Sequence, residues 1–147
     1  MKKSDATILR QSVAKLHDLF RETATNLPGM PDIDISVREN HILSLICRLT
    51  EEKKEGIALK ELAAAMKLAP ATVSELVEDL VNKNLLVRVQ NPNDRRAIQI
   101  TLSKYGQKLV DESLRSIDEL CGKLLSGLSA SEQKAFLDSM ARLANNL

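Results

Sequence analysis

The chain has 147 residues, a length that fits one domain with one core and leaves little room for a second. Apolar residues make up 44% of it and aromatic residues only 2%, which predicts a soluble, helix-rich domain with an aliphatic core. The formal net charge of +1 means that total charge cannot attract a nucleic acid, so any basic footprint must come from the placement of Lys and Arg.

Two amphipathic helices are predicted before residue 51. Between residues 6 and 26, apolar side chains recur at spacings of four, three and four, the period of one helix face: Leu9, Val13, Leu16 and Phe20. The segment "LPGMPDIDI" then interrupts the helical pattern. A capping box of Ser36 and Glu39 begins a second helix, whose apolar face carries Ile42, Leu45, Ile46 and Leu49.

The middle of the chain predicts a helix-turn-helix. Ile57 and Ala58 are expected to form a short strand ahead of a brief helix, whose apolar positions are Leu59, Leu62, Ala63 and Met66. A second helix runs from Pro70 to about Asn82, because proline fits the first helical position, where its missing N–H costs nothing. Two short helices joined by about four residues are typical of a helix-turn-helix.

After this pair, the apolar period changes to that of strands. The segments "LVRVQ" and "AIQITL" alternate, are rich in β-branched residues and flank the turn-forming "NPND", so they predict a β-hairpin. Helix returns at Ser103 and continues to about Leu125, and a second capping box, Ser129 with Glu132, begins a last helix. The fold class is therefore mainly α with a small β-hairpin wing, a winged helix-turn-helix between terminal helices.

Three stretches carry a family pattern: the helix-turn-helix in "LKELAAAMKLAPATVSELVEDLVNKNLL", the hairpin turn "NPNDRRA", and "LSKYG" at the start of the next helix. Together they resemble the MarR (multiple antibiotic resistance regulator) family. The turn is the most specific of the three. The flanking helices match in place and spacing, so the resemblance covers nearly the whole chain.

The resemblance implies one MarR-type domain over residues 1–147, with dimerisation helices in 6–35 and 104–147 and a DNA-binding winged helix-turn-helix in 36–103. Such a homodimer binds a pseudo-palindromic operator in double-stranded DNA. It acts as a transcription repressor. It releases its DNA when a small-molecule effector binds, and this effector is often anionic or aromatic. The apolar stripes of the terminal helices fit this division, because they exceed what one small core absorbs and favour a partner chain.

The second helix of the helix-turn-helix has an acidic outward face. With Val73 at the centre of its buried side, the outward side chains are Ala71, Glu75, Glu78 and Asn82. Members of the family commonly carry Ser, Arg and Ser at positions 69–71, and often Arg at position 75. An acidic face is unexpected beside DNA phosphates, and three accounts of it remain open.

In the first account, Glu75 accepts a hydrogen bond from a cytosine amino group, while Ala71 or the methyl group of Thr72 packs on a thymine methyl. In the second, the acidic side chains pair with lysines and only tune affinity. In the third, the helix binds a protein, and the chain is a dimeric winged-helix interaction or ligand-binding module that has lost sequence reading. Thr72 and Ser74 also carry hydroxyls that can donate to phosphate.

The wing supplies cationic candidates. Arg95 and Arg96 lie at or just after the hairpin tip, where a side chain can enter the minor groove or bind phosphate, and the resemblance implies the same role. Asp94 is expected to pair with an arginine and fix its direction. The lesser candidates for phosphate contact, for which a solvated surface charge is the preferred interpretation, are Arg88 of the wing and Lys60, Lys67 and Lys83.

The histidines, the cysteines and the absence of known catalytic motifs argue against an enzyme or a metal site. His17 and His41 fall on separate predicted helices, and no catalytic or phosphate-loop motif is present, so we expect no enzyme activity, metal or cofactor. Cys47 and Cys121 are too far apart for a zinc site or a disulfide framework and are expected to be small buried hydrophobes. No apolar run approaches the roughly 20 residues of a membrane span, which favours the cytoplasm.

Overall fold

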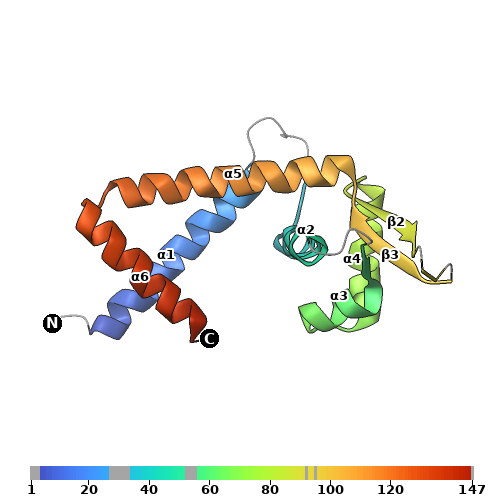
Figure 1. The fold of residues 1–147 in the computed structure, drawn as a ribbon, viewed down its shortest axis with the longest axis horizontal. Helices are drawn as coiled ribbons and strands as arrows, with labels where there is room; N and C mark the ends of the chain where they lie inside the picture. Colours follow the sequence, from blue (N-terminus) through green and yellow to red (C-terminus); the bar gives the residue numbers. More distant parts are fainter. Residues whose placement is uncertain (1–3, 27–33, 52–55, 92, 95, 147) are drawn as a thin grey trace.

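The computed structural model describes residues 4–26, 34–51, 56–91, 93–94 and 96–146, which form the arch shown in Figure 1. A long helix runs along the top, the terminal helices descend at one end, and the helix-turn-helix with its small sheet descends at the other. In chain order, the elements are α1 (Asp5–Thr25), α2 (Val37–Thr50), β1 (Ile57–Ala58), α3 (Leu59–Met66), α4 (Pro70–Asn82), β2 (Leu86–Gln90), β3 (Ile98–Leu102), α5 (Lys104–Ser126) and α6 (Ala130–Asn145).

Serine N-caps begin the four longest helices. The side chains of Ser4, Ser36, Ser103 and Ser129 each accept a hydrogen bond from the backbone N–H three residues later. In α2 and α6 the third helical residue is a glutamate, whose carboxylate accepts a hydrogen bond from the backbone N–H of the cap serine. This confirms both predicted capping boxes. Local sequence therefore decides where these helices start.

The sheet is antiparallel, with strand order β1-β3-β2. The predicted hairpin is β2 paired with β3 in a register that sets Arg88 opposite Ile100 and Gln90 opposite Ile98. Strand β1 adds Ile57 to the other side of β3, also opposite Ile100. This third strand ties the hairpin to the start of the helix-turn-helix.

The core lies inside the winged helix and beneath the first turns of α5. Its apolar side chains come from α2, from the helix-turn-helix, from the sheet and from α5, and the largest fully buried ones are Ile42, Leu43, Ile46, Leu62, Val73, Val77, Leu80, Leu85, Leu86, Leu109 and Val110. Val73, Val77 and Leu80 share one face of α4. Burial of this face fixes which side of α4 points outward.

Gly106 lets α5 pass close to the connection between α4 and β2. A Cβ atom built on Gly106 would lie only 2.0 Å from the backbone oxygen of Leu85. The same junction holds Ser103, whose Oγ donates to the Asn84 carbonyl at 2.5 Å and accepts from the Gly106 N–H at 2.8 Å. The long helix therefore starts directly against the winged helix.

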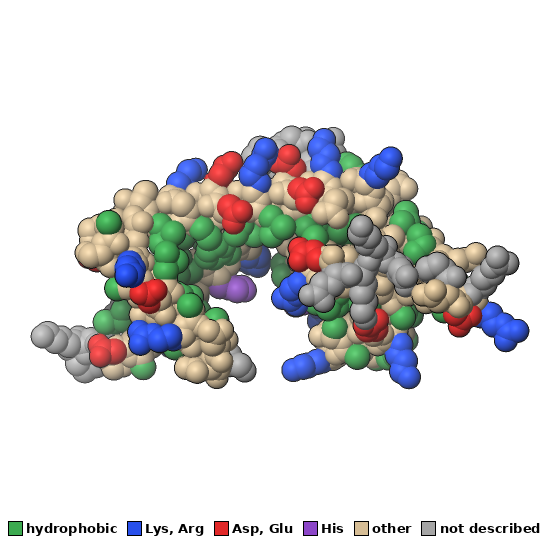
Figure 2. Space-filling view, viewed as in Figure 1, with side chains coloured by type: hydrophobic (Ala, Val, Ile, Leu, Met, Phe, Trp, Pro, Cys, Tyr) green, Lys and Arg blue, Asp and Glu red, His purple; other side chains and the backbone are tan. Residues whose placement is uncertain are grey.

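The terminal helices leave apolar side chains uncovered. Leu9 of α1 is 64% exposed, Leu143 of α6 is 61% exposed, and α6 buries no residue within the chain. Figure 2 shows apolar side chains gathered along the underside of the arch. Among the described residues, no helix has the length and apolarity needed to cross a membrane.

Candidate nucleic-acid interface

The turn between α3 and α4 sets the direction of the second helix. Lys67 adopts a left-handed conformation, with φ 54° and ψ 39°, and ends α3 while the N–H groups of Lys67 and Leu68 bind carbonyls of its last turn. Pro70 occupies the first turn of α4 as predicted, and Ala69 provides no side-chain cap. The first amides of α4 consequently have no hydroxyl partner at the N-cap.

Helix α4 presents the outward face expected from its period. Ala71, Glu75, Glu78 and Asn82 are all exposed, whereas Thr72 and Ser74 are half-buried at its edges. The four predicted recognition-helix residues (Ala71, Thr72, Ser74 and Glu75) thus lie on the accessible side of the first two turns. The acidic character of this face is a property of the folded chain and not only of the sequence.

The two carboxylates on this face differ in their partners. The Arg88 guanidinium of β2 donates to Glu78 Oε2 at 2.6 Å, which joins the wing to α4. Both side chains remain about half exposed. Glu75 has no hydrogen-bond or ion-pair partner among the described residues. Arg88, predicted as a wing contact, therefore engages an acidic residue of the recognition helix.

The hairpin tip is organised by its own backbone. The N–H of Asn91 donates to the Ala97 carbonyl, and the N–H of Ala97 donates to the Asp94 carbonyl, each at 2.9 Å. The Asp94 carboxylate accepts from the backbone N–H of Arg96 at 3.0 Å. In the part of the chain that the structure describes, its partner is thus a backbone amide, and the expected pairing of Asp94 with an arginine side chain stays a prediction. Arg96 is exposed, and Arg95 lies outside the described residues.

Lys83, a predicted phosphate contact, is bound within the fold. Its Nζ donates to Glu39 Oε1 at 2.7 Å and to the Asp34 carbonyl at 2.6 Å. The Glu39 side chain is only 7% exposed. Burial by itself would raise the pKa of Glu39, but hydrogen bonds from Lys83 and Ser36 and the positive charge of Lys83 hold it below its ordinary value.

Lys60 and Lys67, the other predicted cationic candidates, are exposed on and just after α3. Figure 2 shows Lys and Arg side chains projecting from the lower edge of the lobe that carries α3 and α4 and from the end of the wing. Lys60, Lys67 and Arg96 therefore remain accessible, while Lys83 and Arg88 are held by carboxylates. This surface mixes cations and carboxylates.

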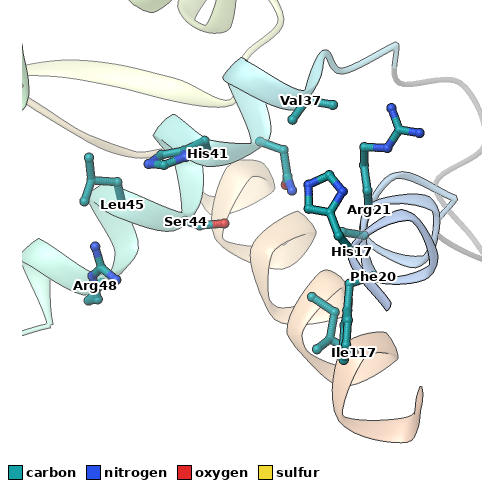
Figure 3. A pocket seen from close by; sticks show the side chains of 11 residues that line it. His17, Phe20, Arg21, Val37, His41, Ser44, Leu45, Arg48 and Ile117 are labelled. Carbon is teal, nitrogen blue, oxygen red and sulfur yellow. The ribbon is translucent and has the colours of Figure 1, made fainter. Parts of the chain in front are cut away.

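A cavity of about 390 Å³ lies where α1, α2 and α5 meet. Figure 3 shows side chains that line the cavity: His17, Phe20 and Arg21 come from α1, His41, Ser44 and Arg48 from α2, and Ile117 from α5, where it lies beside Phe20. Among the described residues that line this cavity there is no carboxylate. Arg48, His41 and the apolar walls suit an anionic ligand with an apolar body, whereas Arg21 and His17 lie 3.8 and 3.4 Å from the Asp18 carboxylate.

Sequence reasoning missed this arrangement and both ion pairs, Glu39–Lys83 and Glu78–Arg88, which join separate elements. His17 and His41 fall on separate helices, so their shared cavity depends on how α1 and α2 pack. Glu39 and Lys83 lie 44 residues apart, and no local signal joins them. For Glu78, the sequence predicted the position on the outward face of α4 but not the partner Arg88.

No metal or redox centre stands out in the parts of the chain that the structure covers. Within them, no three His, Cys, Asp or Glu side chains gather as metal ligands would. Cys47 and Cys121 are free thiols. Both are half-buried, so they are less enclosed than the sequence predicted.

The chain is similar in sequence to a protein-family model and to several transcriptional regulators. Residues 35–98 match the model of the MarR family. The uncharacterized HTH-type transcriptional regulator YwhA of Bacillus subtilis (strain 168) is 27% identical over 105 residues, which cover 71% of this chain and 75% of that protein. The HTH-type transcriptional repressor MdtR of the same organism is 31% identical over 97 residues, covering 65% of this chain and 63% of MdtR, slightly less than two thirds of its length.

Solved structures share the fold along nearly the whole chain. A mutant of MepR from S. aureus matches with a TM-score of 0.78 and 22% identity, covering 98% of both chains. The S. aureus MepR–DNA complex matches with a TM-score of 0.67 and 23% identity, covering 95% of this chain and 94% of MepR. The winged-helix segment thus matches the MarR family model, and the chain as a whole shares the fold of MepR.

Proposed function

We propose that the protein is a homodimeric transcription regulator that binds double-stranded DNA at a pseudo-palindromic operator. The observation that carries the proposal is the outward face of α4 beside the β2–β3 wing, since a helix of this kind can enter the major groove while a wing reaches the backbone or minor groove. Residues 36–103 form the DNA-binding region of the single domain, residues 1–147.

A second copy of the chain covers the apolar faces of the terminal helices. Side chains of α1 and α6 that are apolar yet exposed include Leu9, Val13, Phe136, Leu137 and Leu143. Such a set exceeds what a monomer commonly leaves in water. Residues 6–35 and 104–147 serve as the dimerisation region, and two-fold symmetry presents two winged helices to the two halves of the operator.

The DNA contacts divide between helix and wing. Ala71, Thr72, Ser74 and Glu75 face the major groove, and Arg95 and Arg96 reach the minor groove or phosphates. Asp94 shapes the wing tip that carries them. Lys60 and Lys67 bind phosphate, while Arg88 and Lys83 do so only after leaving their carboxylate partners.

The protein acts as a repressor that releases DNA when a small molecule binds. MdtR is named a repressor, and MepR has been solved with ethidium bromide and with DNA. The cavity between α1, α2 and α5 joins the dimerisation region to the reading region and is the place for such an effector. The relatives are transcriptional regulators, and we assign this chain the same non-enzymatic role in the cytoplasm.

Selection from a pool of randomised DNA duplexes, followed by salt titration of the enriched site, tests this function. Regulators of this kind enrich a two-fold symmetric sequence, and their affinity falls steeply with salt because phosphate contacts release counterions. No enrichment would support the rival function, a dimeric protein-interaction or ligand-binding module. The acidic residues Glu75 and Glu78 are the observation that favours that rival.

A further inference from the structure

The two glutamates on the outward face of α4 differ in their partners: within the described part of the chain, Glu78 is paired with an arginine, and Glu75 is not. Glu78 binds the Arg88 guanidinium at 2.6 Å, so its charge is balanced within the fold. Glu75 is exposed and has no hydrogen-bond or ion-pair partner among the described residues. In the first two turns of α4, Glu75 is therefore the carboxylate available to a DNA base, and Asp79 lies one turn further along the helix.

A single carboxylate in a major groove discriminates sharply among bases. Cytosine presents its N4 amino group as a donor there, whereas guanine presents two acceptors and thymine presents an acceptor and a methyl group. Adenine offers a donor next to an acceptor. A carboxylate, which only accepts, is thus satisfied by cytosine and repelled by guanine and thymine.

The position of Glu75 suits base contact better than phosphate contact. It lies in the second turn of α4, on the outward face set by the burial of Val73 and Val77. The N-terminal turns of a recognition helix are those that meet base edges. The Glu78–Arg88 pair joins α4 to β2 and so orients the helix relative to the wing beside it.

We propose that Glu75 is a specificity-determining residue that selects cytosine at one position in each half of the operator. The proposal rests on the DNA-binding function proposed above. Selection works largely by exclusion, because guanine and thymine leave the desolvated carboxylate without a donor, and adenine sets its N7 acceptor beside the one donor that it offers. The exposed cations Lys60, Lys67 and Arg96 attract the DNA phosphates, which the negatively charged Glu75 cannot do.

Duplex-pool selection with Glu75→Gln and Glu75→Ala tests the proposal. The wild-type profile contains a cytosine preferred by about ten-fold or more over other bases at one half-site position. Glu75→Gln shifts that position toward adenine, because an amide can pair with both the N6 and N7 groups. Glu75→Ala flattens the preference there to less than about three-fold and leaves the other positions unchanged.

Asp79→Asn is the matched control, since it removes one exposed carboxylate from the same helix. It leaves the base profile as in the wild type and raises affinity for all duplexes alike. An unchanged profile in both Glu75 variants, or the same change in Asp79→Asn, would overturn the role of Glu75 alone. A wild-type protein that enriches no duplex would overturn the DNA-binding function and this inference together.

Discussion

The winged helix and the terminal helices carry the same kind of apolar stripe, but within one chain only the stripe of the winged helix is buried. Val73, Val77 and Leu80 of α4 are completely buried, whereas the stripe of α6, including Leu137 and Leu143, stays in solvent. Both stripes follow the period of a helix face. The comparison teaches that periodicity identifies which face of a helix requires burial, while the fold decides whether the same chain can provide it.

The largest effect is expected where two copies would meet. Leu137→Lys should raise the dissociation constant of the dimer by roughly 100-fold or more, because a two-fold interface places the altered side chain at two sites and burial of each leucine contributes about 1.5–3 kcal/mol. Sedimentation velocity over a dilution series measures this. Asp138→Lys, at an exposed position on the opposite face of α6, serves as the control and should keep the wild-type constant. A Leu137→Lys protein that associates like the wild type would remove α6 from the interface.

A core substitution in the winged helix should act through folding instead. Leu80→Ala is expected to lower the free energy of unfolding by about 3–4 kcal/mol, because it removes a fully buried side chain and leaves a cavity. Urea unfolding of the wild type and the variant at equal protein concentration measures the difference. A loss below 1 kcal/mol would show that the winged helix does not depend on its own core.

The Glu39–Lys83 pair stabilises the contact between α2 and α4. Lys83→Met should cost about 1–2 kcal/mol at neutral pH, since it leaves the nearly buried Glu39 with only the capping contacts from Ser36. Urea unfolding checks this, with Lys60→Met as the control at an exposed lysine. An equal effect in the two variants would argue against a specific contribution of the pair.

This contribution also depends on pH. The pKa of Glu39 in the folded chain lies below its ordinary value of 4.5, so the native state favours the charged carboxylate. The resulting stabilisation is present above pH 4.5 and is lost as the pH falls through the folded-state pKa. Unfolding at a series of pH values should therefore show the Lys83→Met difference shrinking below that point. A difference that stays constant to pH 3 would contradict the assignment.

The smallest effect is expected at the exposed link between helix and wing. Glu78→Gln should change the free energy of unfolding by less than about 1 kcal/mol, because both Glu78 and Arg88 are about half exposed and water screens their attraction. Raising the salt concentration to about 1 M should diminish even this difference. A loss above 2 kcal/mol would mean that the pair is buried in the assembled protein.

Local signals predicted most of the fold. Ser36 with Glu39 and Ser129 with Glu132 marked helix starts that the structure reproduces, since a capping box needs only residues three apart. The hairpin followed from alternation on both sides of a turn, and the outward face of α4 followed from its period. These features depend on neighbours in sequence.

The partners of the site residues could not be predicted in the same way. Arg88 is held by Glu78 and Lys83 by Glu39, and both pairs arise from the packing of separate elements. The cavity that His17 and His41 both line likewise depends on how α1 meets α2. A charged residue in a sequence has many possible partners, and only the tertiary fold chooses among them.

Sedimentation equilibrium of the full chain tests most directly whether a second copy covers the terminal helices. The chain has a mass of 16.3 kDa. At micromolar concentrations the account predicts a species of twice that mass, which dissociates only on strong dilution. A monodisperse species of 16.3 kDa across the same concentrations, with its helices intact by circular dichroism, would contradict it.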